Sequence, residues 1–107
     1  MSTLPSSQKF SLLHLTTFQD GAIVSRQITK TKSGNVTLFA FDAGQELSEH
    51  TAPFDALVHI LEGEAEIRIS GQVYRLSASE AILMPANEPH AVRATQRLKL
   101  LLTMLRT

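Results

Sequence analysis

Apolar and polar residues alternate in short runs along most of this chain, and turn residues separate the runs at regular intervals. The clearest case is residues 64–70, which read Glu-Ala-Glu-Ile-Arg-Ile-Ser. Because successive side chains of a strand point to opposite faces, this run predicts a strand with one wet and one buried face. A Ser-Gly-Gln turn at residues 70–72 leads into a second short run, residues 73–76. The two runs therefore predict a β-hairpin.

Further β-prone runs extend from residue 22 to the end of the chain. They cover residues 22–31, 36–42, a short stretch ending at His50, and residues 56–61, 81–84, 90–94 and 98–105. The run 36–42 is apolar on both faces, so we expect it to be a central strand. Only residues 11–20 have room for a helical turn. This pattern predicts an all-β protein built as a sandwich or barrel of antiparallel strands.

The length of 107 residues fits one domain with a single core. We expect residues 22–107 to form the barrel and residues 1–21 to form a segment that packs on the barrel or swaps with it. The polar first residues lack the pattern of a signal peptide, and no apolar stretch approaches about 18 residues. These features predict a cytoplasmic protein with no membrane partner.

Charge and cysteine content exclude several classes of function. Ten basic residues balance ten acidic ones and no basic cluster is present, so we expect no nucleic-acid partner. The chain has no cysteine, which excludes disulfides, thiolate nucleophiles and Cys-based metal sites. We interpret the acidic residues as a solvated face of alternating strands. These residues are Glu46, Glu49, Glu62, Glu64 and Glu66.

Two histidines follow turns at matching places in the two halves of the chain. The first half reads Gly44, five residues, His50, one residue, Ala52, three residues, Ala56, six residues, Gly63. This spacing resembles the first motif of the cupin superfamily. In that family a second histidine stands at the position of Ala52 and a glutamate at that of Ala56.

The second half reads Ser79, five residues, Pro85, one residue, Asn87, two residues, His90, three residues, Ala94. This spacing resembles the second cupin motif, in which glycine stands at positions 79 and 87 and asparagine at 94. Asn87 can adopt the left-handed backbone that glycine would supply. The resemblance covers the chain from about Gly34 onward and implies a double-stranded β-helix, a jelly-roll barrel of antiparallel strands.

The resemblance also implies a divalent metal, which the family holds with three histidines and one glutamate. Here the two candidate ligands His50 and His90 have no glutamate beside them, and uncharged imidazole nitrogens do not offset the charge of a divalent ion. We therefore expect either no cofactor or a weakly held divalent metal. Asp55 would complete the ligand set if the loop after Pro53 turned it inward. Strict alternation directs it outward.

The same alternation directs small aliphatic side chains toward the barrel interior. We expect a ligand pocket lined by His50, His90, Ala52, Ala56, Val58 and Ile60. Such a pocket suits an apolar or aromatic small molecule with one or two hydrogen-bonding groups. The alternatives are a metal-dependent cupin enzyme of the dioxygenase, isomerase or decarboxylase type and a barrel that serves only for dimerisation. Whether the chain is an enzyme stays open at this point.

Leu57, His59 and Leu61 alternate with the interior positions and so point outward. A lone barrel would expose this apolar face, so we expect a homodimer that covers it. The alternative is that the N-terminal segment around Phe10 to Phe18 packs there, either alone or together with a second chain. We interpret His14 as a surface or packing residue.

Overall fold

The computed structural model describes residues 4–106, and within them nearly all regular structure is β. The strands are β1 (Ile23–Thr31), β2 (Gly34–Phe41), β3 (Glu46–His50), β4 (Asp55–Glu62), β5 (Glu64–Ile69), β6 (Gln72–Ser77), β7 (Ala81–Met84), β8 (His90–Ala94) and β9 (Leu98–Leu105). One 3-10 turn, η1 (Leu12–His14), precedes them. The expected strand runs and the expected helical turn within residues 11–20 are confirmed, with ends shifted by one or two residues.

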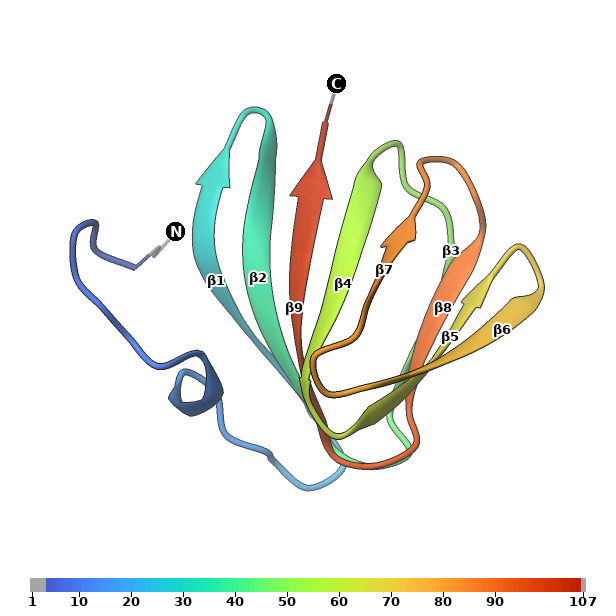
Figure 1. The fold of residues 1–107 in the computed structure, drawn as a ribbon, viewed down its shortest axis with the longest axis horizontal. Helices are drawn as coiled ribbons and strands as arrows, with labels where there is room; N and C mark the ends of the chain where they lie inside the picture. The colour runs from blue at the N-terminus through green and yellow to red at the C-terminus, as the bar shows by residue number, and fades with distance from the viewer. Residues whose placement is uncertain (1–3, 107) are drawn as a thin grey trace.

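The strands form two antiparallel sheets that face each other (Figure 1). One sheet has the order β1-β2-β9-β4-β7 and the other the order β3-β8-β5-β6. The run expected to be central, β2, lies between β1 and β9. The expected hairpin pairs Ile69 with Gln72 at the turn. The predicted antiparallel double-stranded β-helix is therefore confirmed.

The core fills the space between the sheets. Alternate residues of both sheets point inward, as strand geometry requires. Phe41, Ile60, Ile67 and Leu98 are fully buried and belong to one contiguous hydrophobic cluster. This packing fixes the register, because a slip of one residue would turn every inward side chain outward.

Two turns adopt the left-handed backbone that the sequence motif requires. Asn87 has φ 66° and Ser79 has φ 73°, at the two positions where the cupin motif has glycine. The expectation for Asn87 is confirmed. Asparagine tolerates this conformation because its short polar side chain can hydrogen-bond locally.

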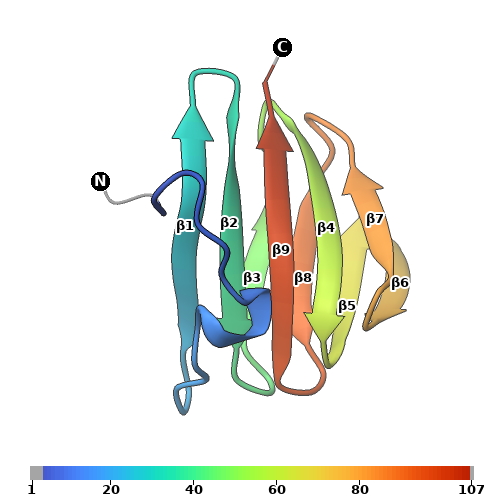
Figure 2. The same ribbon diagram turned by 60° about the vertical axis from the view of Figure 1, so that its left-hand side comes forward.

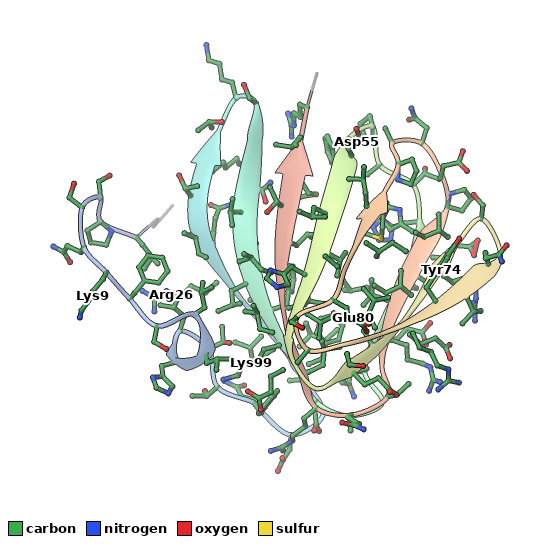
Figure 3. The ribbon with its side chains drawn as sticks, in the orientation of Figure 1. Lys9, Arg26, Asp55, Tyr74, Glu80 and Lys99 are labelled. Carbon is green, nitrogen blue, oxygen red and sulfur yellow. The ribbon has the colours of Figure 1, made fainter. Side chains whose placement is uncertain are left out.

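The segment before β1 crosses the outer face of the five-stranded sheet (Figure 2). Lys99 on β9 donates hydrogen bonds to the carbonyl oxygens of Leu13 and Thr16, the latter at 2.8 Å, and it lies beside this segment in Figure 3. The outward residues Leu38 and Ala40 are fully buried at this part of the sheet. Among residues 4–106 there is no helix long and apolar enough to span a membrane.

The rest of this outer face stays open. Leu57, Leu83 and Leu105 are 40%, 55% and 56% exposed on neighbouring strands, while His59 and Leu61 are half-buried. Residues 4–21 therefore cover only part of the face.

Candidate functional site

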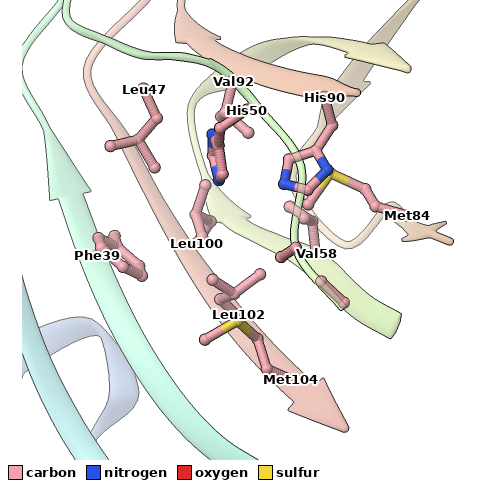
Figure 4. Close-up of a pocket in the computed structure, with 12 residues that line it drawn as sticks. Phe39, Leu47, His50, Val58, Met84, His90, Val92, Leu100, Leu102 and Met104 are labelled. Carbon is pink, nitrogen blue, oxygen red and sulfur yellow. The ribbon is translucent and has the colours of Figure 1, made fainter. Parts of the chain in front are cut away.

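A cavity lies between the two sheets, and both sheets contribute to its wall (Figure 4). Its volume, measured as the space open to the centre of a water molecule, is about 60 Å³. One water needs roughly 10–15 Å³ on this measure, so the cavity has room for a few waters or one small ring. The lining residues are Phe39, Leu47, His50, Ala52, Ala56, Val58, Met84, His90, Val92, Leu100, Leu102 and Met104. Only the two histidines are polar.

A β-bulge brings His50 to the cavity. Leu47 also lines the cavity, and a residue three positions further along a regular strand would point to the opposite face. The ladder between β3 and β8 shifts between Leu47 and His50, so that Leu47 pairs with Val92 and His50 pairs with His90. The extra residue re-aims His50 toward the interior.

His90 begins β8 opposite His50 and is 6% exposed, whereas His50 stands exposed at the mouth. The two rings meet edge to face, with centroids 4.4 Å apart and an angle of 69° between their planes. This arrangement is typical of favourable aromatic contacts. The histidines are therefore direct neighbours.

Backbone carbonyl groups orient both rings. The Nδ1 atom of His50 lies 2.8 Å from the carbonyl oxygen of Ser48, and that of His90 lies 3.1 Å from the carbonyl oxygen of Glu88. A carbonyl oxygen only accepts hydrogen bonds, so each Nδ1 donates.

The environment of His90 disfavours its charged form. Burial lowers the pKa of His90 below its ordinary value of 6.5, and the neighbouring His50 lowers it further. The hydrogen bond to the carbonyl group of Glu88 opposes these effects and is outweighed. His90 is therefore neutral at pH 7.

Two loops are joined to each other at the mouth. The amide of Asn87 donates to the carbonyl oxygen of Ala52 at 2.8 Å, and the amide of Ala86 donates to Oδ1 of Asp55 at 2.9 Å. The Ser70 hydroxyl donates to Glu88 at 2.6 Å and ties the same loop to the β5–β6 hairpin. These bonds hold the backbone around the two histidines.

Two of the predicted site residues lie away from the cavity wall. Asp55 is exposed, does not line the cavity, and accepts the hydrogen bond of the adjacent loop, because strand alternation turns it outward at the start of β4. Ile60 points inward but is fully buried in the core and does not line the cavity. Ala52, Ala56 and Val58 do line it together with the two histidines.

The sequence reasoning missed the wall contributed by β2, β7 and β9. Phe39, Met84 and Met104 are examples, and all three take inward positions of their strands. The alternation along residues 98–105 and 81–84 carries a signal for these positions. The order of the strands, which decides which inward residues meet at the mouth, is not visible in that alternation.

The acidic face is only partly solvated, which corrects its interpretation for Glu66. The side chain of Glu66 is 14% exposed and lies 3.6 Å from Arg75 and 3.5 Å from Arg93. Arg93 pairs with Glu66 across the strands, so the carboxylate is bridged between two arginines.

The donor set of the cavity does not fit a protein-held divalent metal. Within the described part of the chain, no three or more His, Asp or Glu side chains come together in a way that could hold one. Alanine occupies the positions of the second histidine and the glutamate of the cupin motif, at Ala52 and Ala56. Two neutral nitrogens leave a divalent charge without a compensating carboxylate.

Two antiparallel sheets that enclose a small cavity, with paired histidines at its mouth, define a double-stranded β-helix barrel with an internal site. A sequence model described as the cupin domain matches residues 37–104. Since this match covers more than half of the chain, the protein belongs to the cupin domain family.

Solved structures are similar to this chain over its whole length. A conserved protein of unknown function from Streptococcus pyogenes is 32% identical, with a TM-score of 0.92 over 100% of this chain and 96% of that one. A cupin superfamily protein from Desulfitobacterium hafniense is 27% identical, with a TM-score of 0.91 over 99% and 97% of the two chains.

A curated relative, a protein named polyketide synthase CurC from Streptomyces cyaneus, is 29% identical over 62 residues. The match covers 57% of this chain and 40% of that protein. The matched part thus spans about two fifths of the length of the curated relative.

Proposed function

We propose that this cupin domain binds one small organic molecule, apolar over most of its surface, in the cavity between its sheets. The observation that carries the proposal is the lining: every one of the twelve residues except His50 and His90 is apolar. Sites for small organic molecules have this composition, with a few polar groups that orient the ligand.

The metal-dependent enzyme is not the function we propose, because the cavity supplies two neutral nitrogens and no carboxylate. A divalent ion at this place would take the rest of its ligands from solvent or from a bound molecule. We expect its affinity to be correspondingly low.

The methionines provide a direct test of the proposal. The chain has three, of which Met84 and Met104 line the cavity. In protein labelled with ¹³C at the methionine methyl groups, titration with a panel of single-ring compounds such as toluene and phenol should shift both resonances in a saturable way.

Two substitutions make this titration specific for the cavity. Ala52 is half-buried and lines the mouth, so Ala52→Phe should block entry and abolish the shifts. Ala78→Phe places the same ring on an exposed turn between β6 and β7 and should leave the shifts unchanged. Binding by no compound of the panel, or equal binding by the Ala52→Phe variant, would contradict the proposal.

A further inference from the structure

The backbone fixes which nitrogen of each histidine carries the hydrogen. Because Nδ1 donates to the carbonyl oxygen of Ser48 in His50 and of Glu88 in His90, each Nδ1 is protonated. A neutral imidazole has a single N–H group, so Nε2 of each ring is left with a lone pair. The two histidines are thus acceptors at Nε2.

The described residues provide no internal donor for these lone pairs. No backbone or side-chain group of residues 4–106 donates a hydrogen bond to Nε2 of either histidine. The other lining side chains are aliphatic, aromatic or thioether groups without a polar hydrogen. The side-chain polar groups that the cavity offers a ligand are therefore acceptors only.

On the proposed function, we infer that the ligand is a neutral molecule that donates hydrogen bonds, namely a small apolar ring or short chain bearing hydroxyl groups. A carboxylate or an ether would bring lone pairs against the Nε2 lone pairs and leave them unpaired in an apolar site. An ammonium group has hydrogens to donate, but no carboxylate in the lining offsets its charge. The volume of about 60 Å³ limits the apolar part to about one ring.

Four probes of similar size separate this inference from simple apolar binding: phenol, anisole, toluene and benzoate. The Met84 and Met104 methyl resonances report binding of each. We expect phenol to bind about tenfold more tightly than anisole or toluene, and benzoate to bind more weakly than all three at pH 8.

Substitution of the histidines tests whether Nε2 causes this preference. His50→Phe and His90→Phe each keep a ring in the edge-to-face pair and remove one acceptor. Each should reduce the advantage of phenol over anisole, measured as the ratio of the two affinities within the same variant. If His90→Phe fails to fold, His50→Phe at the exposed mouth still makes the comparison.

The tautomer itself can be measured by long-range ¹H–¹⁵N correlation NMR of the histidine rings at pH 8. We expect His50 and His90 to carry the proton at Nδ1. Protonation at Nε2 in either ring, or binding of anisole or benzoate as tight as that of phenol, would overturn the inference and leave the proposed function standing. Binding of none of the four probes would overturn both.

Discussion

His90 combines burial with direct contact to a second imidazole, and its pKa is lowered by both. In the unfolded chain a histidine titrates near 6.5, so below that pH the unfolded state binds more protons than the folded state. The free energy of unfolding should therefore decrease as the pH falls below about 6.5. Well above that pH His90 is neutral in both states, so it should cause no pH dependence there.

Thermal unfolding measured between pH 8 and pH 5 tests this expectation. His90→Gln should reduce the slope of Tm against pH below about 6.5. His14→Gln, at an exposed position far from the cavity lining, should keep the slope of the parent protein. An unchanged slope in the His90→Gln protein would show that this histidine does not cause the pH dependence.

Lys99 is one of the residues that attach the N-terminal segment to the sheet, beside Arg97, which pairs with Asp20. It is 7% exposed, and its ammonium group donates to two backbone carbonyl groups and lies over the ring of Phe18 at 5.1 Å. Lys99→Met should keep the packing of the aliphatic part of the side chain and lose the contacts of the ammonium group. We expect this loss to lower the free energy of unfolding by about 1–3 kcal/mol.

Hydrogen exchange should locate the effect of Lys99→Met in residues 11–20. Lys30→Met removes an exposed lysine from β1 and should change neither stability nor exchange. If exchange in residues 11–20 stayed as slow as in the parent protein, the contacts of Lys99 would not contribute to holding this segment.

At the scale of elements, the turn between β4 and β5 depends on glycine at position 63. Its φ is 85°, and a Cβ added there would overlap the carbonyl oxygen of Arg97. Gly71 in the β5–β6 hairpin has nearly the same φ, 83°, but a Cβ there would meet no atom within 4 Å. Alanine at Gly71 therefore measures the cost of backbone strain alone, whereas alanine at Gly63 adds the cost of steric overlap.

Gly63→Ala should destabilise the fold by about 2 kcal/mol or more, and Gly71→Ala by about 1 kcal/mol, the ordinary cost of a left-handed residue. Chemical denaturation of the two variants measures the difference. Equal losses would mean that the chain at residue 97 moves aside at no cost.

The elements were largely predictable because alternation and turn residues are local signals. The hairpin of residues 64–76 and the strand ending at Ala94 follow directly from them. The bulge before His50 was not predictable, because it depends on pairing with β8 rather than on β3 alone. Its effect on His50 was reached only through the resemblance to the cupin motif.

The site was predictable only in part, because alternation along a strand is a local signal and strand order is not. The inward positions of β4 could be assigned from alternation, but the contacts of Asp55 and Ile60 depend on where the adjacent loop and the core lie. The walls from β2 and β9 depend on strand order, which brings segments distant in sequence together.

Within residues 4–106, the outer face of the five-stranded sheet carries exposed leucines that the described part of the N-terminal segment does not cover. Leu57, Leu83 and Leu105 are exposed there, and Leu57 pairs with Leu83 on the neighbouring strand. We predict a homodimer through this face, as the outward pattern of β4 indicates.

Leu57→Glu should convert the dimer to a monomer in light scattering coupled to size-exclusion chromatography. Val73→Glu, which places the same charge on an exposed residue of the other sheet, should leave the mass unchanged. A parent protein that is monomeric at all concentrations, or a Leu57→Glu variant that stays dimeric, would refute this interface.

The central claim is that the space between the sheets is a site for an organic molecule rather than for a metal ion. Metal content by mass spectrometry, on protein purified without a histidine tag or chelator and beside His50→Ala, tests it most directly. We expect far less than one metal ion per chain in both proteins, because two neutral nitrogens form a weak site. About one ion per chain in the parent protein, lost in His50→Ala, would contradict the claim and show that the two imidazoles have found further ligands.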